Sequence, residues 1–126
     1  MSKKQTILVI PDLHVPFHHQ DALAFLKAVK KKYAPTEVVC LGDFEDWHSI
    51  SMHDHDPDGL SAGAELAALR DASKPFFKLF PKVKMCTSNH GSLPLRRAYK
   101  HGLPKELFKS YKDILQAPQG WVWKIS

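Results

Sequence analysis

The segment TILVIPDLH, residues 6–14, decides the fold of this 126-residue chain. Its apolar part predicts a fully buried strand over Thr6–Ile10, and Pro11 ends that strand because proline cannot donate to a ladder. Two polar residues, Asp12 and His14, follow directly. The same order of a β-type apolar run and a polar cluster recurs twice, in EVVCLGDFED (37–46) and KVKMCTSNH (82–90).

Helical patterns separate these three runs. Apolar residues at helical spacing predict a helix over residues 21–33 and a second, capped by Ser61, over residues 61–73. We expect Pro75 to kink or break the chain before residues 76–80. Strand, helix, strand, helix, strand with these connection lengths indicates an α/β fold with a βαβαβ core and a parallel sheet with right-handed crossovers. The three polar clusters then meet at one end of that sheet, where the carboxyl ends of its parallel strands lie.

The remainder of the chain is expected to add two helices and a strand. A helix is predicted over Leu93–Lys100, another from Pro104 to Lys112, and a final strand over Trp121–Ile125. Trp121 and Trp123 alternate along this strand, so they share one face, where packing is the simpler role than base stacking. No repeat or linker divides the sequence, which predicts a single domain over residues 1–126. The resemblance described below implies that this domain is partial.

The net charge of the chain indicates which class of partner it could bind, but it does not identify the partner. Lys and Arg number 18 against 13 acidic residues, which gives a formal charge of +5 and a pI near 9.3. This excess suits a phosphate-bearing partner such as nucleic acid. Four of the lysines, however, are Lys27, Lys30, Lys31 and Lys32 at one helix end, where cations complement the helix dipole. Charge alone therefore does not establish nucleic-acid binding.

Neither disulfide chemistry nor a membrane anchor is indicated. Cys40 and Cys86 fall near the ends of buried-strand patterns, and their spacing suggests reduced core thiols. No stretch approaches the roughly 20 apolar residues of a membrane-spanning helix, and the apolar run after the basic start is too short for a signal peptide. We expect a cytoplasmic protein that does not contact a membrane.

The polar clusters carry ligands for divalent metal ions. Asp12 and His14 lie two residues apart on an extended segment, so both side chains can reach one ion. Asp43 offers a carboxylate that can bridge two ions, and Asn89 supplies an amide oxygen to the second. This donor set suits Mn²⁺, Fe or Zn²⁺ better than Ca²⁺. Two such ions about 3.5–4 Å apart would clamp a phosphate and activate a water for in-line attack.

These motifs together resemble the first three blocks of the calcineurin-like metallophosphoesterase family, particularly its small bacteriophage-type members. The resemblance implies a layered α/β/β/α sandwich around two mixed sheets and hydrolysis of phosphate esters with two divalent ions, Mn²⁺ first, with Fe, Zn²⁺ or Ni²⁺ as alternatives. It implies that Asp12 and His14 bind the first metal, Asp43 bridges and Asn89 binds the second. His90 would contact or protonate the leaving oxygen, and Asp46 would orient His90.

The chain departs from the family pattern at several positions. Ser88 stands where glycine is usual, Gly91 where an acid is usual, and Trp47 where an arginine contacts phosphate, a role that we assign to His48. We also expect His18 to line the crevice and contact substrate. The family completes its site with two later histidine blocks, whereas His101, at a predicted helix end, is the one histidine after His90. We therefore expect the family's C-terminal strands to be missing from this chain.

Three functions remain open on the sequence. The first is a metal-dependent phosphoesterase acting on phosphodiesters or nucleic acid. The second is a catalytically silent binding or assembly module, whose site and sheet are completed by another chain or by a second copy. The third is calcium binding by the loop from Asp54 to Glu65, which has the spacing of an EF-hand loop but is stiffened by Pro57.

Overall fold

The protein is described by a computed structural model that covers residues 4–124. Its strands are short and form one parallel sheet in the order β1-β2-β3-β4. All four have four residues: β1 (Ile7–Ile10), β2 (Glu37–Cys40), β3 (Val83–Cys86) and β4 (Trp121–Lys124). The predicted α/β class and parallel βαβαβ core are thus confirmed. Over the described residues there is this single sheet, so the layered arrangement of two sheets stays a prediction.

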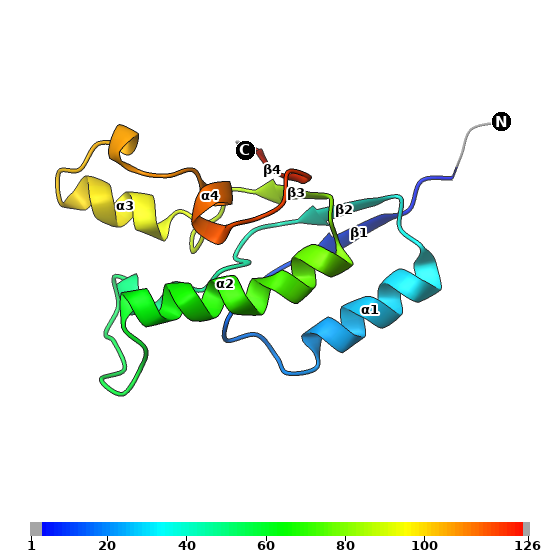
Figure 1. Cartoon of the computed structure of the whole chain (residues 1–126), viewed down its shortest axis with the longest axis horizontal. Helices are drawn as coiled ribbons and strands as arrows, with labels where there is room; N and C mark the ends of the chain where they lie inside the picture. Colours follow the sequence, from blue (N-terminus) through cyan, green and yellow to red (C-terminus); the bar gives the residue numbers. More distant parts are fainter. Residues whose placement is uncertain (1–3, 125–126) are drawn as a thin grey trace.

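The helices are arranged around one face and one end of the sheet (Figure 1). The two long helices, α1 (Ala22–Tyr33) and α2 (Ala62–Leu79), lie together beneath it. Beyond the carboxyl ends of the strands lie α3 (Leu93–Lys100) and the 3-10 turn η2 (Lys105–Leu107), while α4 (Tyr111–Leu115) packs between α2 and β4. A further 3-10 turn, η1 (His48–Ile50), follows the second polar cluster.

The core lies between the sheet and the two long helices. Phe44, which follows β2, is 1% exposed and contacts the rings of Phe76 and Phe77 on α2 and of Trp121 on β4. The Trp121 indole also donates a hydrogen bond of 2.7 Å to the carbonyl oxygen of Phe80, which satisfies its buried N–H. This aromatic cluster ties the segment after β2 and the strand β4 to α2.

Two of the predicted elements differ in the structure. α2 continues through Pro75 to Leu79 instead of breaking, because its buried residues Leu69, Ser73 and Phe76 keep their helical spacing across the proline. The helix predicted from Pro104 to Lys112 is wrong. It is replaced by η2 and α4, because Ser110 adopts an extended conformation and caps α4 by accepting a bond of 3.2 Å from the Asp113 N–H.

The other predicted elements are confirmed to within about one residue, except that Ile125 lies outside the described residues. Cys40 is buried and Cys86 half-buried, both as free thiols, and burial raises the pKa of Cys40 to about 12. His101 lies at the C-terminal end of α3, as expected. No helix among residues 4–124 is long and apolar enough to cross a bilayer.

The second face of the sheet is open in the described residues. Ile7 and Val9 of β1 and Val122 of β4 alternate with buried or half-buried neighbours and are 50%, 48% and 41% exposed. Between them, Lys84 of β3 forms an ion pair with Glu37 of β2. Exposed apolar residues on edge strands are a feature that proteins usually cover.

Candidate metal centre

The first two polar clusters are joined by backbone pairing that continues beyond β1 and β2. The His14 N–H donates to the carbonyl of Asp43 at 2.9 Å, and the Val15 N–H donates to that of Phe44 at 2.6 Å. The Asp46 N–H returns a bond of 3.0 Å to the carbonyl of Val15. Because these bonds fix the register of the two loops, their side chains are brought to one place by the sheet itself.

The third cluster is attached to the second through Asp43. Its carboxylate Oδ1 accepts a bond of 3.0 Å from the His90 N–H, and its own N–H donates 2.7 Å to the Ser88 hydroxyl. The Gly91 N–H donates to the same hydroxyl at 3.2 Å. Ser88, which the sequence presented as a departure from the family pattern, therefore binds the loop of Asp43 to the loop of His90.

The loops hold an unusual backbone conformation at three of these residues. Asp12, His14 and Asp43 all have positive φ, at 49°, 56° and 51°. Side chains other than glycine adopt this left-handed region at a cost of about 1–3 kcal/mol, and such residues cluster at functional sites. Asp12 and His14 are therefore not on an extended segment, as the sequence led us to expect, yet their side chains still converge.

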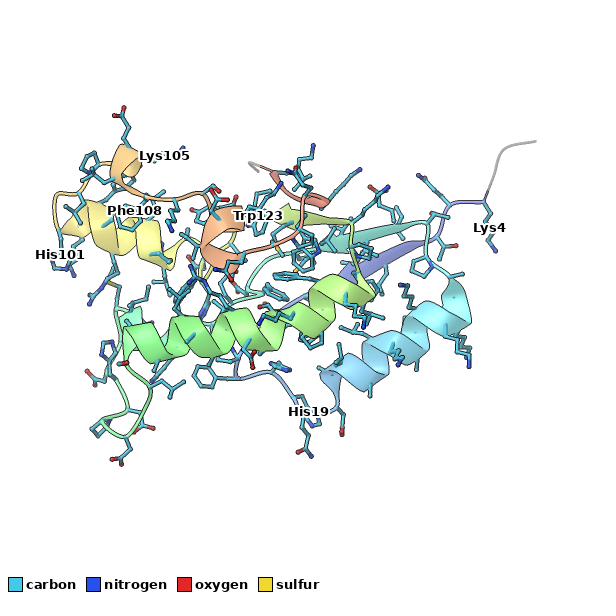
Figure 2. All side chains as sticks on the ribbon, in the orientation of Figure 1. Lys4, His19, His101, Lys105, Phe108 and Trp123 are labelled. Atoms are coloured by element: carbon cyan, nitrogen blue, oxygen red, sulfur yellow. The ribbon has the colours of Figure 1, made fainter. Side chains whose placement is uncertain are left out.

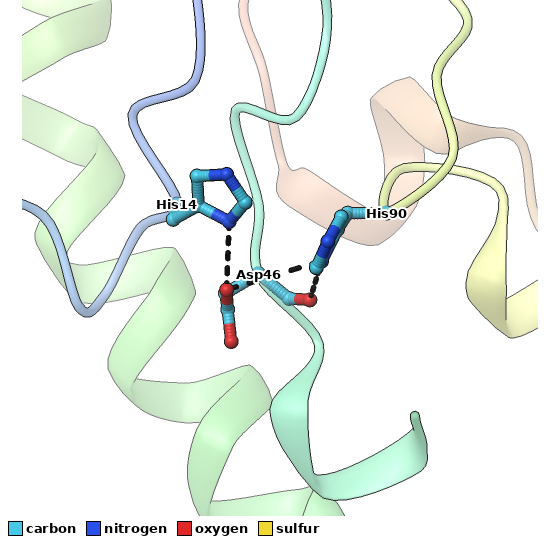
Figure 3. Close-up of side chains that lie close together, drawn as sticks. All are labelled: His14, Asp46 and His90. Carbon is cyan, nitrogen blue, oxygen red and sulfur yellow. Dashed lines mark hydrogen bonds and ion pairs between the residues drawn. The ribbon is translucent and has the colours of Figure 1, made fainter. Parts of the chain in front are cut away.

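Asp46 holds both imidazole rings of the cluster (Figure 3). Its carboxylate Oδ1 lies 2.7 Å from Nδ1 of His14, and its backbone carbonyl lies 2.6 Å from Nδ1 of His90. A carbonyl can only accept, so Nδ1 of His90 carries the proton, and the same assignment follows for His14 beside an ionised carboxylate. The Nε2 atoms of both rings are therefore left with free lone pairs. The rings meet edge to face, with centroids 4.6 Å apart.

The residues predicted to hold the first metal do converge. Asp12, His14 and Asp43 each place one ligand atom within 4.8 Å of the other two, and His14 reaches Asp12 through Nε2, the nitrogen that is free. One imidazole and two carboxylates suit a borderline divalent ion at bonds of roughly 2.0–2.2 Å. The Asp46 carboxylate on Nδ1 of His14 completes the usual outer support of a metal-binding histidine. The donor set therefore fits a divalent metal.

The charge state of Asp43 also suits a metal ligand. Burial alone would raise its pKa, but the His90 N–H, the Ser88 hydroxyl and the two nearby imidazoles stabilise the carboxylate, and the net effect is a lowered pKa. Asp43 is therefore ionised throughout the neutral range. The stability that these contacts contribute is present above the ordinary pKa of an aspartate and is lost as the pH falls through the lowered value.

Replacing Asp46 by alanine will weaken Mn²⁺ binding by about 10- to 100-fold. The His14 ring loses the carboxylate that fixes its orientation and raises its basicity, an effect of this size for outer partners of metal-bound histidines. Isothermal titration with Mn²⁺ measures it, with Asp71→Ala on the exposed side of α2 as the control. Equal affinities for the two variants would show that Asp46 does not support a metal ligand.

The remaining predicted site residues occupy less central positions. Asn89 is exposed in the β3–α3 loop, where its backbone carbonyl accepts 2.6 Å from the Arg96 guanidinium. His48 accepts through Nε2 from the Asp56 N–H at 3.4 Å, which ties it to the following loop. The ring of His18 packs edge to face against that of Phe76, with the ring centroids 5.3 Å apart. Burial lowers the pKa of His18. The second-metal role of Asn89 and the substrate contacts of the two histidines stay predictions.

The calcium hypothesis loses its principal ligand. Glu65, which would bind the ion at the last position of an EF-hand loop, is 1% exposed. Its two carboxylate oxygens accept from the N–H groups of His48 and Ser49 at 3.1 and 2.8 Å, so it anchors η1 to α2. Residues 51–60 form an irregular loop that follows a three-residue 3-10 turn and no entering helix.

One acidic residue near the site was not identified from the sequence. Glu45 is 3% exposed, and its Oε1 lies against Gly91, where an added Cβ would be only 3.0 Å away. Burial, with a smaller contribution from the Asp43 charge, raises its pKa to about 7. Nothing in the sequence marked it, because an acid between two site aspartates reads as another exposed loop residue.

The Glu45 carboxyl makes stability depend on pH in a definite direction. Between its ordinary value of 4.5 and about 7, the folded chain keeps a proton that the unfolded chain releases. Folding stability therefore falls as the pH rises through that window. Glu45→Gln removes this loss, so its gain over the parent chain grows from pH 5 to pH 8, by up to about 3 kcal/mol. Urea unfolding in EDTA checks it, and parallel pH curves would contradict it.

Comparison of the chain with protein-family models, with curated proteins and with solved structures finds no match in any of the three.

Proposed function

We propose that this chain is a metal-dependent phosphoesterase that hydrolyses phosphodiester bonds, with nucleic acid as the preferred class of substrate. We propose further that its sheet is the core of a calcineurin-like metallophosphoesterase sandwich. One observation carries the proposal: Asp12, His14 and Asp43 converge on one point at the sheet edge, directly beside the imidazole of His90. Metal ligands next to an imidazole combine the groups that metal-ion catalysis and general acid catalysis of phosphate hydrolysis can use.

Each residue has a role that its contacts support. Asp12 and His14 would hold one divalent ion, with Asp43 between that ion and a second one bound by Asn89. When bound, the ions supply Lewis-acid stabilisation of phosphate charge and a nucleophile at neutral pH. Asp43 enters this role already ionised, since its pKa is lowered. Asp46 positions His14 through its carboxylate.

His90 is the residue that we assign to the leaving group. Its Nδ1 donates to the Asp46 carbonyl, so the ring cannot rotate freely and Nε2 is the atom left for the phosphate ester. An imidazolium at Nε2 would give its proton to the departing alkoxide, which is the general-acid step. The Asp46 carboxylate lies 3.9 Å from Nδ1 of His90.

The test is Mn²⁺-stimulated hydrolysis of bis(p-nitrophenyl) phosphate by the chain. The absorbance of the released p-nitrophenolate measures the rate. We expect activity that needs added Mn²⁺ and is lost in EDTA. Turnover that is equally fast in EDTA would remove the metal from the proposal, and a folded chain that shows no turnover with Mn²⁺, Fe²⁺, Zn²⁺ or Ni²⁺ would remove catalysis.

A second candidate function is an assembly module without turnover. The open face of the sheet favours it, because exposed apolar residues lie on both edge strands, Ile7 and Val9 on β1 and Val122 on β4, and neither edge is paired within residues 4–124. A chain that showed no hydrolysis in the assay above, yet sedimented as a dimer or larger species, would support this candidate over the first.

A further inference from the structure

A groove lies on the side of the molecule where α3, η2 and α4 face β4. Its volume is about 940 Å³, at the upper end of the roughly 300–1,000 Å³ range of small-molecule sites. Three aromatic residues line it: Phe108 after η2, Tyr111 at the start of α4 and Trp123 in β4. Figure 2 shows Phe108 beside α3 and Trp123 near the end of the sheet.

The aromatic rings that line the groove are more exposed than the aromatic rings of the core. Trp121, two residues away on β4, is 2% exposed and packs with Phe77 and Phe44. Trp123 and Phe108, by contrast, are half-buried, so part of each ring is open to the groove. The sequence suggested packing for both tryptophans, and the structure assigns it in full to Trp121 only.

The rim of the groove is positively charged. Lys105, Lys109 and Lys112 line it, against one acidic residue, Glu106. Lys112 donates to the Gln119 carbonyl at 3.2 Å, while Lys105 and Lys109 are exposed. Aromatic faces surrounded by lysines are the combination that binds single-stranded nucleic acid, where bases stack and lysines contact phosphates.

The groove borders the two ends of the loop that carries the third polar cluster. Thr87 lines it from the residue that precedes Ser88, and Pro94 and Leu95 line it from the first turn of α3. The loop between them carries Asn89 and His90. The groove and the candidate site are therefore connected through this loop, and none of the proposed metal ligands lines the groove.

We propose that this groove binds a base of single-stranded nucleic acid between Phe108 and Trp123, with Lys105 and Lys109 on the flanking phosphates. This inference rests on the proposed function, because it names single-stranded nucleic acid as the substrate of the phosphoesterase. Its test, however, is binding rather than turnover.

The experiment is fluorescence anisotropy in EDTA with a labelled 12-nucleotide oligothymidylate and with an abasic strand of equal length and charge. Stacking of one base contributes a factor of roughly 5 to 150 in affinity, so oligothymidylate is expected to bind tighter by that factor. Phe108→Ala removes the difference. Phe25→Ala, at an exposed phenylalanine of α1, leaves it unchanged.

The results of this experiment decide whether the groove binds a base. Equal affinity for the two strands, or no binding of either, overturns the proposal without any variant being needed. If Phe108→Ala does not fold, quenching of tryptophan fluorescence by oligothymidylate but not by the abasic strand replaces it, and the lack of such quenching overturns the proposal. Loss of hydrolysis in Asp43→Asn with unchanged base preference would leave both proposals standing, because the two readouts are independent.

Discussion

Asp43→Asn will abolish Mn²⁺-dependent phosphodiester hydrolysis and reduce Mn²⁺ affinity by more than the roughly 10- to 100-fold that loss of an outer partner causes. The amide oxygen still accepts the bond that the carboxylate receives from the His90 N–H at 3.0 Å, so the loop geometry is retained. What is lost is the charge, and with it the ligand that we place between the two ions. Initial rates on bis(p-nitrophenyl) phosphate and titration with Mn²⁺ measure the two effects.

A matched variant separates charge at the site from charge in general. Asp54→Asn removes one carboxylate from the exposed loop before α2 and is expected to change neither the rate nor the affinity. It also removes the first residue of the calcium-type loop. If Asp43→Asn kept its activity, or if both variants lost it equally, Asp43 would not be the central ligand.

Gly42→Ala will destabilise the chain by roughly 2–6 kcal/mol, the combined range for a strained backbone and an overpacked contact. Gly42 has φ of 107°, and an added Cβ would lie 2.2 Å from Cβ of Ser88. The methyl group must push away the serine whose hydroxyl holds Asp43 and Gly91. Stability and Mn²⁺ binding are therefore expected to fall together, as measured by urea unfolding and by titration.

Gly63→Ala provides the control for this substitution. An added Cβ there meets nothing within 4 Å, and the position lies inside the first turn of α2. Alanine in a helix is favoured over glycine by about 1 kcal/mol, so this variant is expected to be as stable as the parent or more so. Equal stability of the Gly42 and Gly63 variants would mean that the close approach of the two loops is not maintained in solution.

The fold could be predicted because its signals are local. The first two β-type runs are ended by Pro11 and Gly42, and the lengths between the three runs leave room for one helix each. The predicted end of a helix failed where tertiary packing overrode a local rule, as at Pro75, through which α2 continues without a break because Phe76 is buried against the core. A second prediction failed at Ser110, which begins a new helix inside the segment expected to be one.

The sequence predicted three residues of the candidate site, but it did not predict the contacts that hold them in place. The sequence brought Asp12, His14 and Asp43 to one edge, because parallel strands end on the same side. It could not show that Asp46 holds His14 by its carboxylate and His90 by its backbone carbonyl, because the second contact depends on main-chain atoms. Nor could it show that Glu45 is buried, since its burial arises from the fit of the β3–α3 loop.

The central claim is that the three strand-end clusters form one metal centre, and electron paramagnetic resonance of the Mn²⁺-loaded chain tests it most directly. The account predicts saturable Mn²⁺ binding with a coupling to one imidazole nitrogen, and the loss of that coupling in His14→Gln. A spectrum of fully hydrated Mn²⁺ at every ratio of metal to protein, or a nitrogen coupling that survives in His14→Gln, would contradict it.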